Sequence, residues 1–141
     1  MKSLVVYFSR GGKTKRVADA IANELGCKAI DIKNELPQSI DVDLLVVGSG
    51  NYGGKPHDSI QKFLDSLQAG NGSKAAIFTT SGGPNPRCLP LMQKALESKE
   101  YTVASYFACR GQFLFFNRGH PDDGDLESAR EFASALRNGI K

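Results

Sequence analysis

Short, mainly apolar runs alternate along the chain with segments that repeat apolar residues every three or four positions. The runs are rich in β-branched and aromatic residues, which is typical of strands buried on both faces of a parallel sheet. They predict five strands, at residues 4–8, 28–32, 44–48, 74–80 and 102–108. The periodic segments predict helices at residues 15–25, 60–67, 91–96 and 126–136, and Gly26 is a natural C-cap for the first of them.

Strands that alternate with helices favour right-handed βαβ crossovers and a doubly wound sheet. We therefore expect an α/β fold, a three-layer α/β/α sandwich around a five-stranded parallel sheet with strand order 2-1-3-4-5. A ligand is expected over the C-terminal ends of strands one and three, where this order reverses. No repeat or linker interrupts the pattern, so the 141 residues predict a single domain, 1–141.

The composition is that of an ordinary soluble globular protein, with 40% hydrophobic and 23% charged residues. No apolar stretch could span a bilayer and no signal-peptide pattern is visible, so we expect a cytoplasmic protein. Cys27, Cys88 and Cys109 lack metal-binding spacing, and we expect reduced thiols, at least two of them buried, and no metal. The net charge of +3 suits a surface that meets acidic partners, but nothing predicts nucleic-acid binding.

The segment Ser9-Arg10-Gly11-Gly12-Lys13-Thr14 connects the first predicted strand to the first helix. Such a loop presents unpaired backbone N–H groups and the positive end of a helix dipole, and it therefore predicts a phosphate site. The nucleotide triphosphate P-loop needs a glycine where Tyr7 stands, and the dinucleotide fingerprint needs a third glycine, so neither motif matches. A plain αβ corner with a solvated basic helix start is the alternative.

The order hydroxyl, two spacers, glycine, spacer, threonine resembles the phosphate loop of the flavodoxin family, usually written Thr or Ser, any, Thr, Gly, any, Thr. Ser9, Gly12 and Thr14 match it, and Gly11 stands where a threonine is common. In that family the loop holds the phosphate of FMN, so the resemblance implies an FMN cofactor. Flavodoxins are mostly acidic and tend to bind this phosphate without basic side chains, so this chain departs from the family at Arg10, Lys13, Lys15 and Arg16.

The connection after the third predicted strand is Ser49-Gly50-Asn51-Tyr52-Gly53-Gly54-Lys55-Pro56. A flat isoalloxazine ring stacked on Tyr52 would gain about 0.5–1.5 kcal/mol beyond burial. This run resembles the ring-binding loop of short flavodoxin-like proteins, which implies that a peptide within Tyr52–Gly54 turns over when the flavin is reduced. The alternative is a tight turn at Gly53 and Gly54 before a helix that starts at Pro56.

The connection after the fourth predicted strand is Thr80-Ser81-Gly82-Gly83-Pro84-Asn85-Pro86. Its hydroxyl and N–H groups could line the pyrimidine edge of the flavin. Many flavodoxins place a second aromatic residue here and this chain has none, so one ring face is open or is covered by residues 113–116. His57 and His120 are expected as surface or capping residues, and no catalytic constellation is visible.

Together the three connections predict an FMN-binding, flavodoxin-like electron-transfer protein, a monomer or weak dimer that works between redox partner proteins. The absence of a recognisable pyridine-nucleotide site favours this carrier. The single ring-binding aromatic and the basic charge favour a small FMN-dependent reductase of quinone-like acceptors instead. A flavin-free binding module is the third alternative. A receiver domain is disfavoured, because Ser9-Arg10 and Gly48-Ser49 stand where its acidic residues belong.

Overall fold

The computed structural model describes residues 2–37, 40–52, 54–81, 87–110 and 123–139, with the backbone alone at Ser81, Cys109 and Arg110. All five predicted strands and all four predicted helices are confirmed. In chain order they are β1 (Ser3–Tyr7), α1 (Lys13–Leu25), β2 (Lys28–Asp31), β3 (Leu44–Gly50), α2 (Asp58–Ser66), β4 (Lys74–Ser81), α3 (Cys88–Ser98), β5 (Thr102–Arg110) and α4 (Asp123–Gly139). Among the described residues, no helix has the length and apolar content that crossing a membrane requires.

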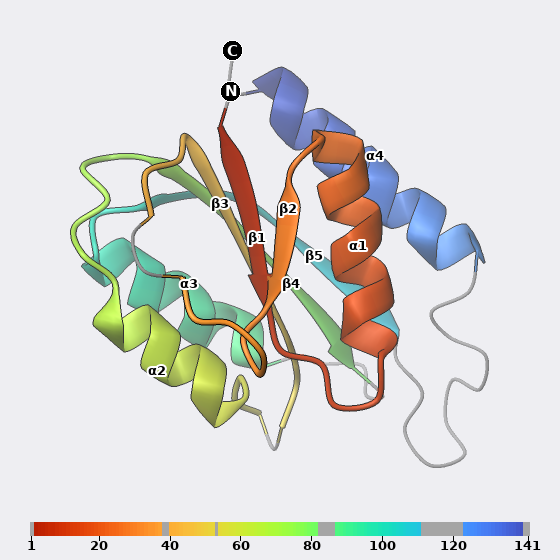
Figure 1. Ribbon diagram of the computed structural model, residues 1–141, viewed down its shortest axis with the longest axis horizontal. Coiled ribbons are helices and arrows are strands. Elements are labelled where there is room, and N and C mark those ends of the chain that lie inside the picture. Colours follow the sequence, from red (N-terminus) through yellow and green to blue (C-terminus); the bar gives the residue numbers. More distant parts are fainter. Residues whose placement is uncertain (1, 38–39, 53, 82–86, 111–122, 140–141) are drawn as a thin grey trace.

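The five strands form one parallel sheet in the order β2-β1-β3-β4-β5, as predicted (Figure 1). The strand β1 pairs on both sides, so that Val5 lies opposite Ala29 of β2 and Val46 of β3. All strands run in the same direction, and their carboxyl ends therefore meet at one edge of the sheet. We call this edge the carboxyl edge.

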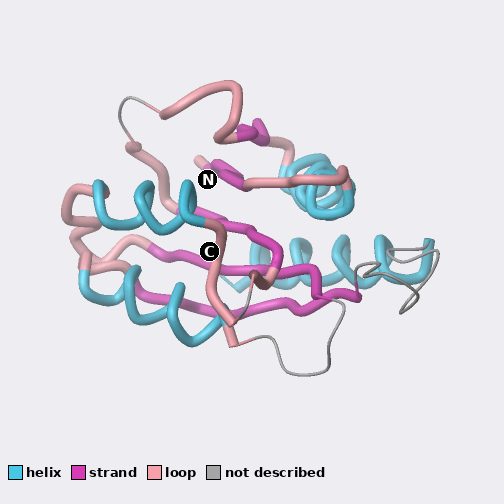
Figure 2. Tube along the Cα trace, turned by 90° about the horizontal axis from the view of Figure 1, so that it is seen from below, coloured by secondary structure: helices cyan, strands magenta, loops and turns pink. Residues whose placement is uncertain are grey.

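Helices cover both faces of the sheet, with α1 and α4 on one face and α2 and α3 on the other (Figures 1 and 2). Alternate residues of β1 follow this division, because Val5 packs in the core under α1 and α4 while Val6 packs in the core under α2 and α3. The two cores contain fully buried side chains such as Ile21 in the first and Met92 in the second. This two-sided burial explains why the strands read as apolar runs.

The connection from β2 to β3 contains no helix in its described residues. It crosses the sheet face that α2 and α3 cover, and Ile32, Ile40 and Val42 pack against that core from the connection. Leu36 lies at 60% exposure in the same stretch. Because the described part of this connection contains no helix, it places no helix N-terminus at the carboxyl end of β2.

The predicted end of the first helix is confirmed. Gly26 ends α1 in the left-handed region at φ 69°, and its N–H donates to the carbonyl of Asn23. Glycine adopts this conformation without strain, so the predicted C-cap is present. The thiol of Cys88 is buried and Cys27 is half-buried, whereas the side chain of Cys109 lies outside the described residues.

Gly48 of β3 lies against the ring of Phe78 in β4. The two residues are opposite each other in the parallel register. Phe78 is fully buried, and a Cβ atom on Gly48 would overlap its ring. The absence of a side chain at Gly48 is therefore what allows the aromatic ring to lie over β3.

We predict that Gly48→Ala lowers the free energy of unfolding by about 1–3 kcal/mol, the usual cost of overpacking a core. Urea denaturation followed by circular dichroism measures the change. Gly11→Ala is the matched control, because no heavy atom lies within 4 Å of a Cβ at Gly11. Combining Gly48→Ala with Phe78→Leu should cost less than the sum of the two single changes, since the smaller side chain makes room. Unchanged stability of Gly48→Ala would contradict this packing.

Candidate functional site

The connection from β1 to α1 lies at the carboxyl edge and is held by Ser9. The side chain of Ser9 is 2% exposed, and its Oγ accepts a 3.0 Å hydrogen bond from the N–H of Gly12. That hydroxyl therefore keeps its own hydrogen available as a donor. Gly12 is the N-cap of α1 with φ 90°, a conformation that favours glycine, and it makes no side-chain capping bond.

Several backbone N–H groups converge in this connection without an acceptor. Among the described residues, none accepts a hydrogen bond from the N–H groups of Arg10, Gly11, Lys13, Thr14 or Lys15. The first turn of α1 also contains no acidic side chain. The start of α1 is therefore a concentration of donors and of positive dipole, which is the arrangement that binds an anion.

A hydrogen bond between two threonines links this connection to the end of β4. The Oγ1 atoms of Thr14 and Thr80 are 2.8 Å apart and buried, although the residues are separated by 66 positions. Thr79 and Thr80 are both buried at the end of β4. The predicted loops after strands one and four are thus in direct contact. Ser81 is described by its backbone alone, and Gly82 and Gly83 lie outside the described residues.

The connection after β3 closes on itself through Tyr52 and Lys55. The N–H of Tyr52 donates to the carbonyl of Lys55 at 2.7 Å, and the N–H of Lys55 donates back at 3.2 Å. Gly54 lies between them with φ 87°, and Gly53 is outside the described residues. The structure thus has a tight turn here, but the following helix starts at Asp58 and not at Pro56.

Two polar side chains hold this connection in place. Ser49 is completely buried, and its Oγ accepts from the N–H of His57 and donates to the carbonyl of Gly50. The Oδ1 of Asn51 accepts a 3.2 Å bond from the N–H of Cys88 at the start of α3. The predicted cofactor contacts of Ser49, Gly50 and Asn51 stay predictions, and the structure gives the side chains of Ser49 and Asn51 roles in positioning the loop.

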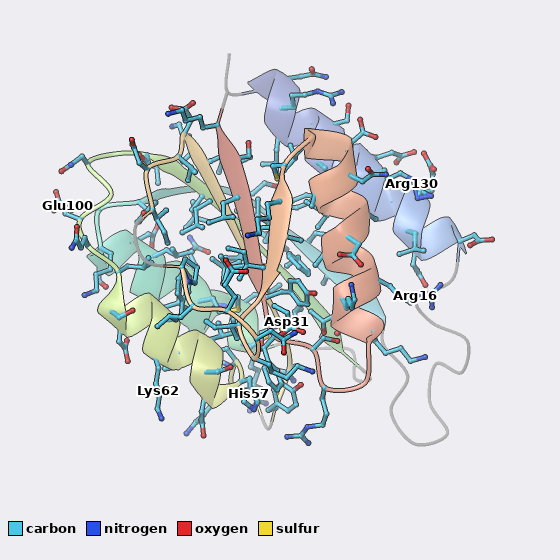
Figure 3. All side chains as sticks on the ribbon, in the orientation of Figure 1. Arg16, Asp31, His57, Lys62, Glu100 and Arg130 are labelled. Atoms are coloured by element: carbon cyan, nitrogen blue, oxygen red, sulfur yellow. The ribbon has the colours of Figure 1, made fainter. Side chains whose placement is uncertain are left out.

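Tyr52 belongs to an aromatic cluster that the sequence analysis did not identify. Phe8 and His57 stack with ring centroids 3.5 Å apart and an interplanar angle of 8°, and Tyr52 meets both rings edge-on. The guanidinium of Arg10 lies over the Tyr52 ring, 5.1 Å from its centroid. His57 lies at the carboxyl edge in Figure 3. Side chains from both connections therefore meet beside the donors of α1.

His57 has the capping role expected for it. Its Nδ1 accepts a 3.1 Å bond from the N–H of Ser59 at the start of α2. Burial lowers the pKa of His57, and the positive charge of Arg10 lowers it further, while Asp58 acts in the opposite direction. The imidazole is therefore neutral at pH 7, as capping through Nδ1 requires. His120 and residues 113–116 lie outside the described residues.

The described part of the site combines backbone donors with uncharged aromatic side chains. Burial raises the pKa of Tyr52, so its phenol is neutral at pH 7. Within the described residues, no three His, Cys, Asp or Glu side chains are grouped as a metal site would need. The arrangement can hold an anion at the start of α1 with an aromatic cluster next to it.

Comparisons with known proteins agree with this architecture. A family model described as a flavodoxin domain matches residues 4–112. An uncharacterized protein from Methanocaldococcus jannaschii is 35% identical over 148 residues, and the match covers 96% of this chain and 98% of that protein. A solved flavodoxin from the domain Archaea has a TM-score of 0.80 at 24% identity, with 99% of each chain covered. A flavoprotein from Lactobacillus acidophilus, solved in complex with FMN, has a TM-score of 0.60 at 22% identity, with 76% of this chain and 92% of that chain covered.

We predict a stability contribution from His57 that depends on pH. Because its folded pKa lies below the ordinary value of 6.5, the contribution is complete above pH 6.5 and is lost as the pH falls through the lowered pKa. His57→Asn keeps a capping acceptor and removes the titration. Between about pH 7.5 and about pH 5 the melting temperature of the wild type should therefore fall more than that of the variant. Parallel curves for the two proteins would show that His57 does not couple protonation to folding.

Proposed function

The chain belongs to the flavodoxin family, and on that premise we propose that it binds FMN at the carboxyl edge and carries electrons between redox proteins. The observation that carries this proposal is the start of α1, where five N–H groups lack an acceptor among the described residues and the first turn contains no acid. An FMN phosphate would satisfy these donors. Ser9 and Thr14 would add hydroxyl donors from the same connection.

The charge at this helix start supports an anionic ligand. Lys13 and Arg16 lie in the first turn of α1, at the positive end of its dipole. A charge of the same sign as the helix end destabilises the helix by about 0.3–1 kcal/mol. A bound anion is attracted both to the helix end and to these basic side chains, so it offsets that cost. A Cβ at Gly11 or Gly12 would meet no heavy atom within 4 Å, so the loop has open space beside it. The residues present therefore fit a phosphate.

The neighbouring connections fit the rest of the cofactor. The side chain of Tyr52 offers an aromatic surface beside the phosphate loop, and Gly54 provides a backbone that adopts φ 87° without strain. The FMN rings, when bound, supply the redox chemistry. The chain's own residues would hold the phosphate, orient the rings and set their surroundings.

Two ionisable side chains near the proposed ring position are uncharged at pH 7. The Tyr52 phenol and the His57 imidazole are both neutral at pH 7, since burial raises the first pKa and lowers the second. The Nδ1 of His57 is already occupied at the start of α2.

The test begins with FMN binding, measured by flavin fluorescence during titration of the flavin-free protein. The loaded protein is then reduced with dithionite and offered a one-electron acceptor protein. Stoichiometric binding and electron transfer in one-electron steps would support the proposal. Direct two-electron reduction with catalytic turnover of a quinone would identify a reductase, and failure to bind FMN would leave a binding module without flavin.

We predict that Thr14→Val weakens FMN binding by about 10- to 100-fold, the loss expected for one hydrogen bond to a charged group. Riboflavin lacks only the phosphate, so its dissociation constant should change much less. Thr80→Val is the matched control, because it removes the same 2.8 Å bond between the two hydroxyls and keeps the hydroxyl of Thr14. It should affect both flavins alike. Equal losses of FMN and riboflavin in Thr14→Val would place the phosphate elsewhere.

We also predict that Gly11→Thr tightens FMN binding. Gly11 has no positive φ, and a Cβ there meets open space, so a threonine fits without strain and adds a hydroxyl donor to the loop. The dissociation constant for FMN should fall about threefold or more, within the range of one added neutral hydrogen bond. Gly12→Thr is the control, because φ 90° strains any side chain there, and we expect lower thermal stability and weaker binding. Weaker FMN binding by a stably folded Gly11→Thr would contradict the proposed phosphate position.

A further inference from the structure

Basic side chains dominate the three connections at the carboxyl edge. Residues 8–16, 49–58 and 80–88 contain one acidic residue, Asp58, and six basic ones: Arg10, Lys13, Lys15, Arg16, Lys55 and Arg87. Lys15 pairs with Asp19 at 2.8 Å. Within the described part of the chain, the other five have no ion-pair partner. We call Arg10, Lys13, Arg16, Lys55 and Arg87 the basic rim.

The basic rim surrounds the aromatic cluster. Arg10 lies over the Tyr52 ring, and the backbone of Lys55 pairs with that of Tyr52. A Cβ on Gly54 would lie 3.6 Å from the side chain of Arg87, so the start of α3 adds its charge to the same loop. Lys13 is half-buried and the other four members are exposed.

Nearby acidic side chains do not neutralise this rim. Asp31 is paired with Lys33 at 3.9 Å, at the end of β2. The acidic residues at the start of α4 lie beyond α1, on its far side from α2 (Figure 1). They are Asp123, Asp125 and Glu127. Asp58 is the one acidic residue within the three connections, so their net charge is positive at neutral pH.

One phosphate does not account for all these charges. A phosphate bound at residues 9–14 would lie near Lys13 and Arg10, but Lys55 and Arg87 belong to the turn after β3 and to the start of α3. We propose that the basic rim is the docking surface for a redox partner protein whose surface is acidic around its own redox centre. This inference rests on the proposed FMN-dependent electron transfer. Opposite charges at the point of electron exit raise the association rate and orient the encounter.

A protein partner fits the rim better than a nucleic acid does. Sequence-tolerant binding of single strands needs exposed aromatic platforms between the basic residues. Phe8 is buried and stacked on His57, and the surface of Tyr52 is assigned to the flavin ring, so neither is available to a strand of bases.

The test measures electron transfer from the reduced, FMN-loaded protein to cytochrome b5, which is acidic, and to cytochrome c, which is basic. Stopped-flow rates are taken at about 0.01 M and about 0.1 M ionic strength, between which the Debye length falls from about 30 Å to about 10 Å. The second-order rate constant with cytochrome b5 should fall as salt is added, and that with cytochrome c should rise. The opposite salt dependence would overturn the proposal.

Charge reversal locates the surface. Lys55→Glu combined with Arg87→Glu should slow the reaction with cytochrome b5 about tenfold or more at low salt and speed that with cytochrome c. Lys74→Glu combined with Lys94→Glu makes the same change in net charge at exposed positions away from the rim, at the start of β4 and on α3. This control should have little effect. If both double variants slow the reaction with cytochrome b5 equally, the slowing comes from net charge, and the proposed docking surface is wrong.

Two further measurements separate this proposal from the one on which it rests. Failure to bind FMN would refute electron transfer, whereas normal FMN binding with no preference for cytochrome b5 would overturn only the docking surface. Binding of oxidised cytochrome b5 to the flavin-free protein, followed by NMR, should also be lost in Lys55→Glu with Arg87→Glu. Duplex DNA that binds the wild type but not this variant, with equal rates for both cytochromes, would assign the rim to nucleic acid and overturn the proposal.

Discussion

The parallel pairing of β1 with β2 on one side and β3 on the other determines where the remaining parts of the molecule lie. The chain leaves β1 through α1 on one face and returns from β2 to β3 across the other face. Connections that diverge in this way leave space above the carboxyl ends of the strands between them. The donors of α1 and the turn at Tyr52 border that space. The sheet order thus places the candidate site before any side chain contributes to it.

Within that space, the start of α1 is left electrostatically unbalanced. Donors without acceptors, two glycines and basic side chains meet at residues 10–16, and the first turn supplies no carboxylate of its own. Such a helix end is stabilised by an external anion. The buried bond between Thr14 and Thr80 holds this end against β4, so that the donors are positioned in advance of binding. Preorganised donors bind an anion at a lower entropic cost than mobile ones.

Hydrogen bonds and ring contacts hold one part of the turn after β3, whereas Gly54 gives another part conformational freedom. Hydrogen bonds to Ser49 and Asn51 link the turn to the starts of α2 and α3. The stacked rings of Phe8 and His57 contact Tyr52 edge-on. Gly54 has a conformation that only glycine adopts freely. A ring-binding loop needs both properties, because the aromatic surface must stay in place while the adjacent peptide adapts to the ligand. The surrounding basic side chains, proposed as a docking surface, attract acidic partner surfaces and repel basic ones.

Local patterns were enough to predict the strands, the helices, the sheet order and the three connections at the carboxyl edge, because periodicity and the chemistry of turn residues act within a few positions. The resemblance of Ser9–Thr14 to a phosphate-binding loop was recognisable for the same reason. The contact of Thr14 with Thr80, the stack of Phe8 on His57 and the approach of Arg87 to Gly54 were not, since each joins residues distant in the chain. The capping role of His57 was predicted, but the bond from its N–H to buried Ser49 was not. Such contacts arise only when register and packing bring separate segments together, and no local pattern encodes them.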